Sequence, residues 1–134
     1  VKDLDFGYQQ IVVRDAKGNK DRVVPLPKKY QGDLQKQLKD RKNLHSDDLA
    51  KGVGSVFMPP ALARKYPNAA NEWIWQYVFA SSRISDDPRS KAVRRHHLHE
   101  RGLQRKIKPA ALRAGITKQV GCHTLRHRFA THLL

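Results

Sequence analysis

The sequence predicts an α+β fold that is mainly α-helical, with a small antiparallel β-sheet packed on helices. Two β-branched segments near the start are separated by a polar turn, which is the pattern of a β-hairpin. Most other apolar residues recur at helical spacing, in segments bounded by Gly or Pro. At 134 residues, the chain has the length of one domain.

The first expected element is the hairpin. β-branched residues cluster at 9–14 and 22–26, and residues 15–21 between them are polar turn formers. Lys17 and Lys20 lie at the expected tip. A tip lysine can enter a nucleic-acid groove and give up a proton if neighbouring cations favour its neutral form. A solvated turn lysine is the structural alternative, and the residues alone leave both open.

Residues 31–50 are expected to form an amphipathic surface helix, with fraying after Asn43 as one alternative. Its apolar positions are sparse and only roughly periodic: Leu34, Leu38, Leu44 and Leu49. His45 is interpreted as a surface residue. Residues 53–60 mix Gly, Pro and apolar residues, and residues 61–66 are expected to make about two helical turns.

Residues 72–79 predict a strand with one aromatic face, because aromatic residues occupy every second position. These residues are Trp73, Trp75, Tyr77 and Phe79. A polar loop is expected at 81–90. From Val93 to Leu112 the pattern becomes helical, with interruptions expected at Gly102 and Pro109 and a C-terminal cap at Gly115.

The charge of the chain predicts a polyanionic partner. Lys and Arg number 27 against 12 Asp and Glu, a formal charge of +15, and nucleic acid is the leading class of partner. Residues 89–108 contain eight Lys or Arg and one Glu, which favours contacts with phosphates over a merely solvated helix face. No apolar window approaches the ~18 residues of a membrane span.

Other features favour a cytoplasmic protein. We find no signal peptide pattern. The single cysteine, Cys122, cannot form an intramolecular disulfide and is interpreted as a small buried filler. His96, His97 and His99 lack a carboxylate or cysteine at ligand spacing, so no metal site is expected.

Residues 123–134 predict a final helix whose opening turn can bind an anion. His123 and Arg126 lie about 60° apart on one edge of an expected core stripe, Leu125, Phe129 and Leu133. A phosphate oxygen there could be held by the imidazole, the guanidinium and the free backbone N–H groups of the first turn. Alternatively, Arg126 only covers the edge of the core.

The final helix, His-Thr-Leu-Arg-His-Arg-Phe-Ala-Thr-His-Leu-Leu, resembles the signature of the tyrosine recombinases, the phage integrase family. The resemblance implies a catalytic histidine at His123 and the second catalytic arginine at Arg126. Residues 16–26 resemble the hairpin of that family, whose tip lysine is the general acid for the leaving 5′ oxygen. The resemblance assigns this role to Lys17, with Lys20 as the alternative and otherwise a DNA contact.

Three further stretches, at 65–79, 87–90 and 93–99, are similar to the segment that distinguishes integron integrases, with a branch-specific insertion at about 53–90. That branch recombines cassette sites folded from one DNA strand and recognises extruded bases. The likeness implies that Trp75 stacks on an extruded base, while Trp73 and Tyr77 are expected to be core residues. The other DNA contacts assigned to this region are Pro88, Arg94, Arg95, and His96 or His97.

In the intact family a tyrosine attacks the scissile phosphate and leaves a 3′-phosphotyrosyl link and a free 5′ hydroxyl. The resemblance implies no metal or nucleotide cofactor and a tetramer on DNA. It also implies a bacterial, nucleoid-associated protein. The family's first arginine, its final histidine or tryptophan and its nucleophilic tyrosine have no match here, so the 134 residues alone are expected not to cleave DNA. Ala16 and Arg128 depart from the family pattern. The rival interpretation is therefore a non-catalytic basic DNA-binding module or a degenerate remnant.

Overall fold

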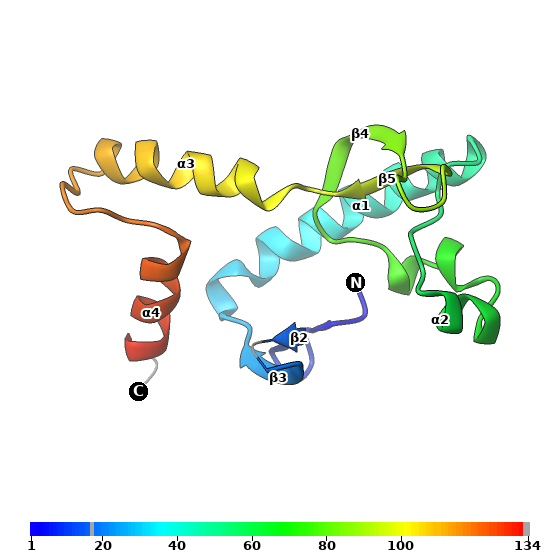
Figure 1. Ribbon diagram of the computed structural model, residues 1–134. Helices are drawn as coiled ribbons and strands as arrows, with labels where there is room; N and C mark the ends of the chain where they lie inside the picture. The colour runs from blue at the N-terminus through cyan, green and yellow to red at the C-terminus, as the bar shows by residue number, and fades with distance from the viewer. Residues whose placement is uncertain (17, 133–134) are drawn as a thin grey trace. The chain divides into compact units, whose positions relative to one another are not determined.

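A computed structural model describes residues 1–16 and 18–132. The chain divides into two compact units, Val1–His97 and Leu98–Leu134, and each is described by itself. In chain order the elements are β1 (Leu4–Asp5), β2 (Gln10–Ala16), β3 (Lys20–Pro25), the 3₁₀ helix η1 (Lys28–Tyr30), α1 (Gln31–Ala50), α2 (Pro60–Lys65), the 3₁₀ helices η2 (Ala69–Asn71) and η3 (Trp73–Trp75), β4 (Ala80–Asp86), β5 (Val93–His97), α3 (Glu100–Arg113) and α4 (Cys122–His132). Helices with small antiparallel sheets confirm the predicted fold class (Figure 1).

The predicted N-terminal hairpin is confirmed as β2 and β3, and β1 pairs with the other edge of β2. All three strands are antiparallel, and the register shifts between Val13 and Ala16. The Arg14 guanidinium braces the sheet, since its Nε lies 3.0 Å from Asp3 Oδ1 and its Nη1 lies 2.6 Å from Asp21 Oδ2. These pairs are exposed and each contributes little to stability.

The hairpin tip uses left-handed backbone. Asp15, Gly18 and Asn19 have φ of 47°, 84° and 58°, and Gly, Asn and Asp are the residues that tolerate this region best. The backbone N–H of Asp15 donates to Asp21 Oδ1 at 3.2 Å. Lys17, the expected general acid, lies outside the described residues.

Helix α1 runs without interruption through Asn43 to Ala50, so the predicted helix is confirmed and it does not fray there. One face carries a stripe of residues spaced alternately by four and three: Leu34, Leu38, Arg41, His45 and Asp48. The leucines are half-buried, whereas the three polar residues are buried. The prediction that His45 lies on the surface is therefore wrong.

A buried ion pair joins α1 to the second sheet. Arg95 on β5 donates from Nε to Asp48 Oδ2 at 2.7 Å and from Nη2 to Asp48 Oδ1 at 2.9 Å. Its Nη1 also donates to the carbonyl oxygen of Ser81 on β4, at 2.9 Å. The hydrogen bonds from Arg95 lower the pKa of Asp48 and the same contact raises the pKa of Arg95. Figure 1 shows the β4–β5 ribbon alongside α1.

His45 sits beside this pair as a neutral, buried ring. Its Nε2 lies 2.9 Å from the carbonyl oxygen of Asn71 and therefore donates to it. Burial lowers the pKa of His45, because the charged ring would lose its hydration, and the Asn71 contact only partly opposes this effect. Arg41 nearby also has a lowered pKa, again chiefly from burial.

We expect the free energy of unfolding to fall as the pH drops below about 6.5, the ordinary histidine pKa. The folded state holds His45 with a lowered pKa, so its contribution is complete above the unfolded value and is lost as the pH falls through the folded one. Urea unfolding at pH 8 and pH 5 measures this dependence. The His45→Gln variant, which keeps a donor without titrating, should lose less stability on acidification than the wild type; an equal loss would contradict the assignment.

The second sheet corrects two predictions. Residues 81–86, expected in a loop, belong to β4, and residues 93–97, expected in a helix, form β5, which pairs with it antiparallel. Neither strand shows an apolar alternation, because polar and charged residues fill both. Tertiary contacts decide the conformation here: Arg95 finds its partner in α1, and local propensity is overridden.

The predicted aromatic strand at 72–79 is also wrong. Trp73–Trp75 form the 3₁₀ turn η3, and Gln76 is fully buried just after it. The Gln76 side-chain amide lies 3.2–3.3 Å from the carbonyl oxygens of Gly54, Ala70 and Glu72. These contacts fold the backbone back on itself, which an extended strand would not allow.

The apolar core of the first unit is small. Val56, Met58 and Ala69 form its buried centre. The partly buried residues packed against it are Leu62, Ala70, Trp75 and Tyr77. Leu62 belongs to α2, where the two predicted helical turns are confirmed. Trp73 and Tyr77 are half-buried rather than fully covered.

In the second unit, α3 runs from Glu100 to Arg113 and includes Gly102 and Pro109. The predicted interruptions of this helix at Gly102 and Pro109 are therefore wrong. Gly costs a helix about 1 kcal/mol, and Pro removes one hydrogen bond. Caps at both ends offset these losses. His99 accepts from the backbone N–H of Arg101, and Gly115, as predicted, follows the helix with φ of 72°.

The final helix is confirmed as α4, but its predicted burial is not. Leu125 is 51% exposed and Phe129 is 43% exposed, and Cys122, expected to be buried, is exposed. Leu133 lies outside the described residues. Among residues 98–132 whose burial is described, only Ala111 is buried. Two helices and a linker contain too little apolar surface to bury the apolar faces of both helices.

Candidate functional site

The first turn of α4 brings His123 and Arg126 together. Both side chains are exposed and line one open hollow of about 500 Å³. Gln104 of α3, with Gly121 and Cys122, completes its lining. No acidic residue lies in the first turn of α4, so the partial positive charge of the free N–H groups adds to the guanidinium charge. The hollow therefore suits an anion.

His123 also contacts His127, one helical turn later. The two Nε2 atoms lie 3.0 Å apart, and the rings meet edge to face with centroids 4.5 Å apart. Sequence reasoning singled out His123 and missed this pair. The spacing of four residues was the available signal, because residues i and i+4 are neighbours on a helix surface.

The surroundings of this site are strongly basic. Between Leu98 and His132 the sequence has eight Lys or Arg and a single acid, Glu100. A second hollow, of about 430 Å³, lies between α3 and the start of α4. Lys108, Lys118 and Thr124 are among its lining residues. The unit thus presents cations and hydroxyl groups around the first turn of α4.

The hairpin tip and the α4 pair belong to different units. Lys20 is exposed at the start of β3, while Lys17 lies outside the described residues. Convergence of Lys17 with His123 and Arg126 on one phosphate therefore stays a prediction.

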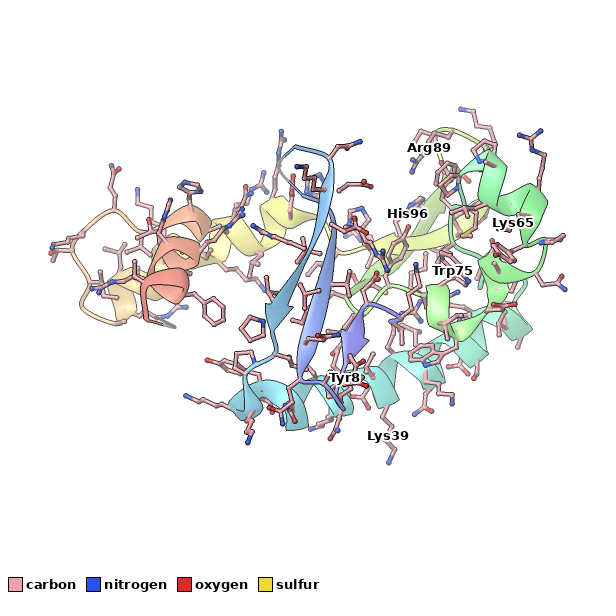
Figure 2. The ribbon with its side chains drawn as sticks, turned by 90° about the horizontal axis from the view of Figure 1, so that it is seen from below. Tyr8, Lys39, Lys65, Trp75, Arg89 and His96 are labelled. Carbon is pink, nitrogen blue, oxygen red and sulfur yellow. The ribbon has the colours of Figure 1, made fainter. Side chains whose placement is uncertain are left out.

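Trp75 is half-buried rather than free in solvent. It lines a hollow of about 430 Å³ in the first unit, and Lys2 Nζ lies 4.1 Å from the centroid of its ring. The backbone N–H of Lys2 donates to the carbonyl oxygen of Ile74 at 2.9 Å, which fixes the segment next to the indole. The ammonium lies over a face of the indole, so a base that stacks on that face would displace Lys2 from its cation–π contact. Figure 2 shows Trp75 with His96 and Arg89 in this unit.

Pro88 is exposed in the turn between β4 and β5. Asp87, which is fully buried, organises this turn by accepting from the backbone N–H of Arg89 at 2.9 Å. That hydrogen bond is the main reason why the pKa of Asp87 is lowered. The Arg89 guanidinium carbon lies 3.8 Å from the centroid of the Phe57 ring. The turn presents Pro88 on a braced loop.

The four residues of β5 assigned to DNA have different surroundings. Arg95 is held by Asp48 and Ser81, so the structure gives it a role in the fold. Arg94 is largely buried and donates to Ser90 Oγ at 3.1 Å. His97 packs edge to face on Tyr77, with centroids 5.4 Å apart. The buried Nε2 of His96 has no hydrogen-bond partner among the described residues.

Within residues 1–16 and 18–132, no group of three or more His, Cys, Asp or Glu side chains could hold a metal ion. No helix in the same ranges is long and apolar enough to cross a bilayer.

Comparison with known proteins gives a consistent picture. The model of the phage integrase family matches residues 1–134. Proteins described as "Integrase/recombinase" from Escherichia coli and Pseudomonas aeruginosa are each 48% identical over 134 residues, which are all of this chain and 40% of each relative. "Tyrosine recombinase XerD" of Listeria monocytogenes is 30% identical over 135 residues, 98% of this chain and 32% of that protein. The chain thus spans about 40% of the length of the more similar relatives.

Proposed function

The chain belongs to the phage integrase family of tyrosine recombinases, and we propose that the whole protein carries out site-specific DNA recombination through a 3′-phosphotyrosyl intermediate. The observation that carries the proposal is the hollow at the start of α4, which His123 and Arg126 line together. In this scheme Arg126 and His123 stabilise the charge that develops on the scissile phosphate.

Lys17 is proposed as the general acid that protonates the leaving 5′ oxygen. The hairpin that carries it is confirmed, and Gly18 and Asn19 beside it supply the left-handed backbone of a tight tip. A flexible primary amine at such a tip has the reach to deliver a proton. Lys20 is proposed as a phosphate contact next to it.

We further propose that the protein acts on integron cassette sites folded from a single DNA strand, with an integron-specific insertion at about residues 53–90 and a tetramer on DNA. Trp75 is the proposed platform for an extruded base, because its ring lines a hollow and an indole face can stack on any base. Pro88, which is exposed in the turn between β4 and β5, and His96 or His97 are proposed to clamp an extruded base. Arg94 and His97 remain proposed DNA contacts. Arg95 is no longer proposed as a DNA contact, because its guanidinium is held by Asp48 and Ser81.

The integron proposal predicts a specific loss on replacing Trp75. Trp75→Leu retains apolar contacts with the core but removes the indole, and base–aromatic stacking contributes roughly 1–3 kcal/mol. Affinity for a folded cassette strand with extruded bases should fall about 5- to 150-fold, while affinity for plain duplex at the same salt concentration stays constant. Competition binding by fluorescence anisotropy measures both.

Trp73→Leu is the matched control, since Trp73 lies next to His45, with ring centroids 6.0 Å apart, and has no assigned DNA role. It should leave the preference for the folded strand unchanged. Equal affinity of the wild type for folded strand and duplex would overturn the integron proposal and leave general DNA recombination standing.

The rival from another class is a non-catalytic basic DNA-binding module. If the whole protein is a recombinase, it should form a covalent adduct with a suicide substrate, which a denaturing gel detects. A binding module should form no adduct. The rival also predicts that every exposed cation contributes similarly to affinity.

A further inference from the structure

Another hollow in the first unit carries arginines and hydroxyl groups. It has a volume of about 500 Å³ and lies between the segment 55–63 and the turn that joins β4 to β5. Its polar lining residues are Ser55, Arg89, Ser90 and Arg94, and none of the described residues in its lining is acidic. The rest of the lining, which includes Phe57, is apolar. Such a lining suits an anionic group that is attached to a less polar one.

One buried carboxylate holds both guanidinium groups. Asp87 Oδ1 lies 3.5 Å from Arg89 Nε, and Asp87 Oδ2 lies 3.7 Å from Arg94 Nε. Asp87 is fully buried and does not line the hollow. Because two positive charges share one negative charge, the three residues keep a surplus positive charge at the wall of the hollow. Asp86 and Lys91, which are exposed on either side of the turn, offset each other and leave this surplus in place.

Donor groups of both arginines remain available to a ligand. The Arg94 side chain is only 12% exposed, and its Nη2 donates to Ser90 Oγ at 3.1 Å, which leaves the Ser90 O–H to donate elsewhere. The Arg89 guanidinium is stacked on Phe57 and the side chain is 60% exposed. Within residues 1–16 and 18–132, neither Nη atom of Arg89 and not Nη1 of Arg94 makes a hydrogen bond. The stacking fixes the plane of a guanidinium whose outer edge can still donate.

These features fit a backbone phosphate of DNA. A guanidinium edge matches the oxygens of a phosphate in a two-pronged contact, and hydroxyl groups add further donors. The chain as a whole carries a formal charge of +15, which favours a polyanion over a small free anion. Arg89 directly follows Pro88, the proposed clamp for an extruded base. A nucleotide held at Pro88 therefore brings its own phosphate to the arginine next to it.

We propose that Arg89, Ser90 and Arg94 form a phosphate-binding subsite in this hollow, which takes a backbone phosphate of the strand beside the base extruded at Pro88. This inference rests on the proposed recognition of folded cassette strands. It gives Arg89 and Ser90 a role in binding, and it assigns the proposed DNA contact of Arg94 to a particular phosphate. Asp87 positions the two guanidinium groups and does not contact the DNA.

The subsite is tested by replacing single phosphates of the folded cassette strand with uncharged methylphosphonates. In the wild type, neutralising the phosphate that occupies the subsite should weaken binding about three- to thirtyfold. In Arg89→Gln the same replacement should have little effect, because the charge that it contacts has already been removed. Fluorescence anisotropy at fixed salt concentration measures both affinities.

Lys91→Gln is the matched control, since it removes an exposed cation of the same turn that does not line the hollow. This variant should keep the full loss on the methylphosphonate strand. If every neutralised phosphate near the extruded bases weakens the wild type and Arg89→Gln equally, the proposal is overturned.

Titration with inorganic phosphate tests the same subsite without a variant of Arg89 and without DNA. The side-chain nitrogen NMR signals of Arg89 and Arg94 should shift together and saturate with phosphate, but not with sodium chloride at equal ionic strength. Signals that move no more than that of the exposed Arg64 on α2 would also overturn the proposal.

The failure of the subsite and the failure of the integron proposal give different results. If the wild type binds folded strand and duplex equally, the integron proposal fails and the phosphate titration still decides the subsite. If it prefers the folded strand but no phosphate shows a dependence on Arg89, only the subsite fails.

Discussion

Replacing Arg126 with alanine is expected to slow the strand cleavage proposed for the whole protein by about 10²- to 10³-fold, the usual loss when one donor to a developing oxyanion is removed. The reason is local: Arg126 shares the hollow at the start of α4 with His123, and no acidic residue lies in that first turn to oppose its charge. Single-turnover formation of the covalent adduct on a suicide substrate measures this rate.

DNA affinity should change far less than the rate. Loss of one phosphate contact weakens binding about uniformly across DNA sequences. It also reduces the slope of log affinity against log salt concentration by roughly one. Arg113→Ala, which removes an exposed arginine from the last turn of α3, is the matched control and should leave the cleavage rate unchanged. Equal rate losses in the two variants would show that Arg126 acts only as one of many surface cations.

Asp48→Ala is expected to destabilise the first unit by about 3–5 kcal/mol, the cost of removing one partner from a buried ion pair. The Asp48 side chain is 1% exposed and that of Arg95 is 8% exposed, so the guanidinium would remain buried without its counter-charge. The loss would also loosen β4–β5 from α1. Urea unfolding followed by tryptophan fluorescence measures it, because Trp73 and Trp75 lie in the same unit.

Asp21→Ala provides the matched control. It removes a carboxylate paired with Arg14 at 2.6 Å, but both side chains are about half exposed, so solvent screens the pair and the expected change in stability is far smaller than at Asp48. The double variant Asp48→Leu with Arg95→Met should recover much of the lost stability, since apolar replacements avoid the desolvation of both charges. A loss at Asp48 no larger than at Asp21 would contradict the structural role of the pair.

The predictable part of the fold is the part with strong local signals. The hairpin at β2–β3, helix α1, the turns of α2, the Gly115 cap and the final helix follow from β-branched runs, helical spacing and turn residues. The strands β4 and β5 did not follow, because their residues are polar and their conformation depends on Arg95 reaching Asp48 on a helix far away in the sequence. Three-residue turns such as η3 depend similarly on the buried Gln76.

Burial was the least predictable property. The stripe on α1 changes from leucine to buried Arg41, His45 and Asp48 along one face, and sequence rules place such polar residues in solvent. On α4 the reverse occurs, since Leu125 and Phe129 are exposed. For the candidate site, His123 and Arg126 were found from spacing and resemblance, whereas His127, one helical turn after His123, was not singled out.

The most direct test of the account compares Arg126→Ala with the wild type on two versions of the scissile linkage. One substrate carries the ordinary phosphodiester, and the other carries a methylphosphonate, which lacks the negative charge. If Arg126 neutralises that charge, the fold loss in cleavage rate caused by Arg126→Ala should be smaller on the methylphosphonate than on the phosphodiester, by a factor of about ten or more. An equal loss on both substrates would contradict the claim that Arg126 acts on the phosphate.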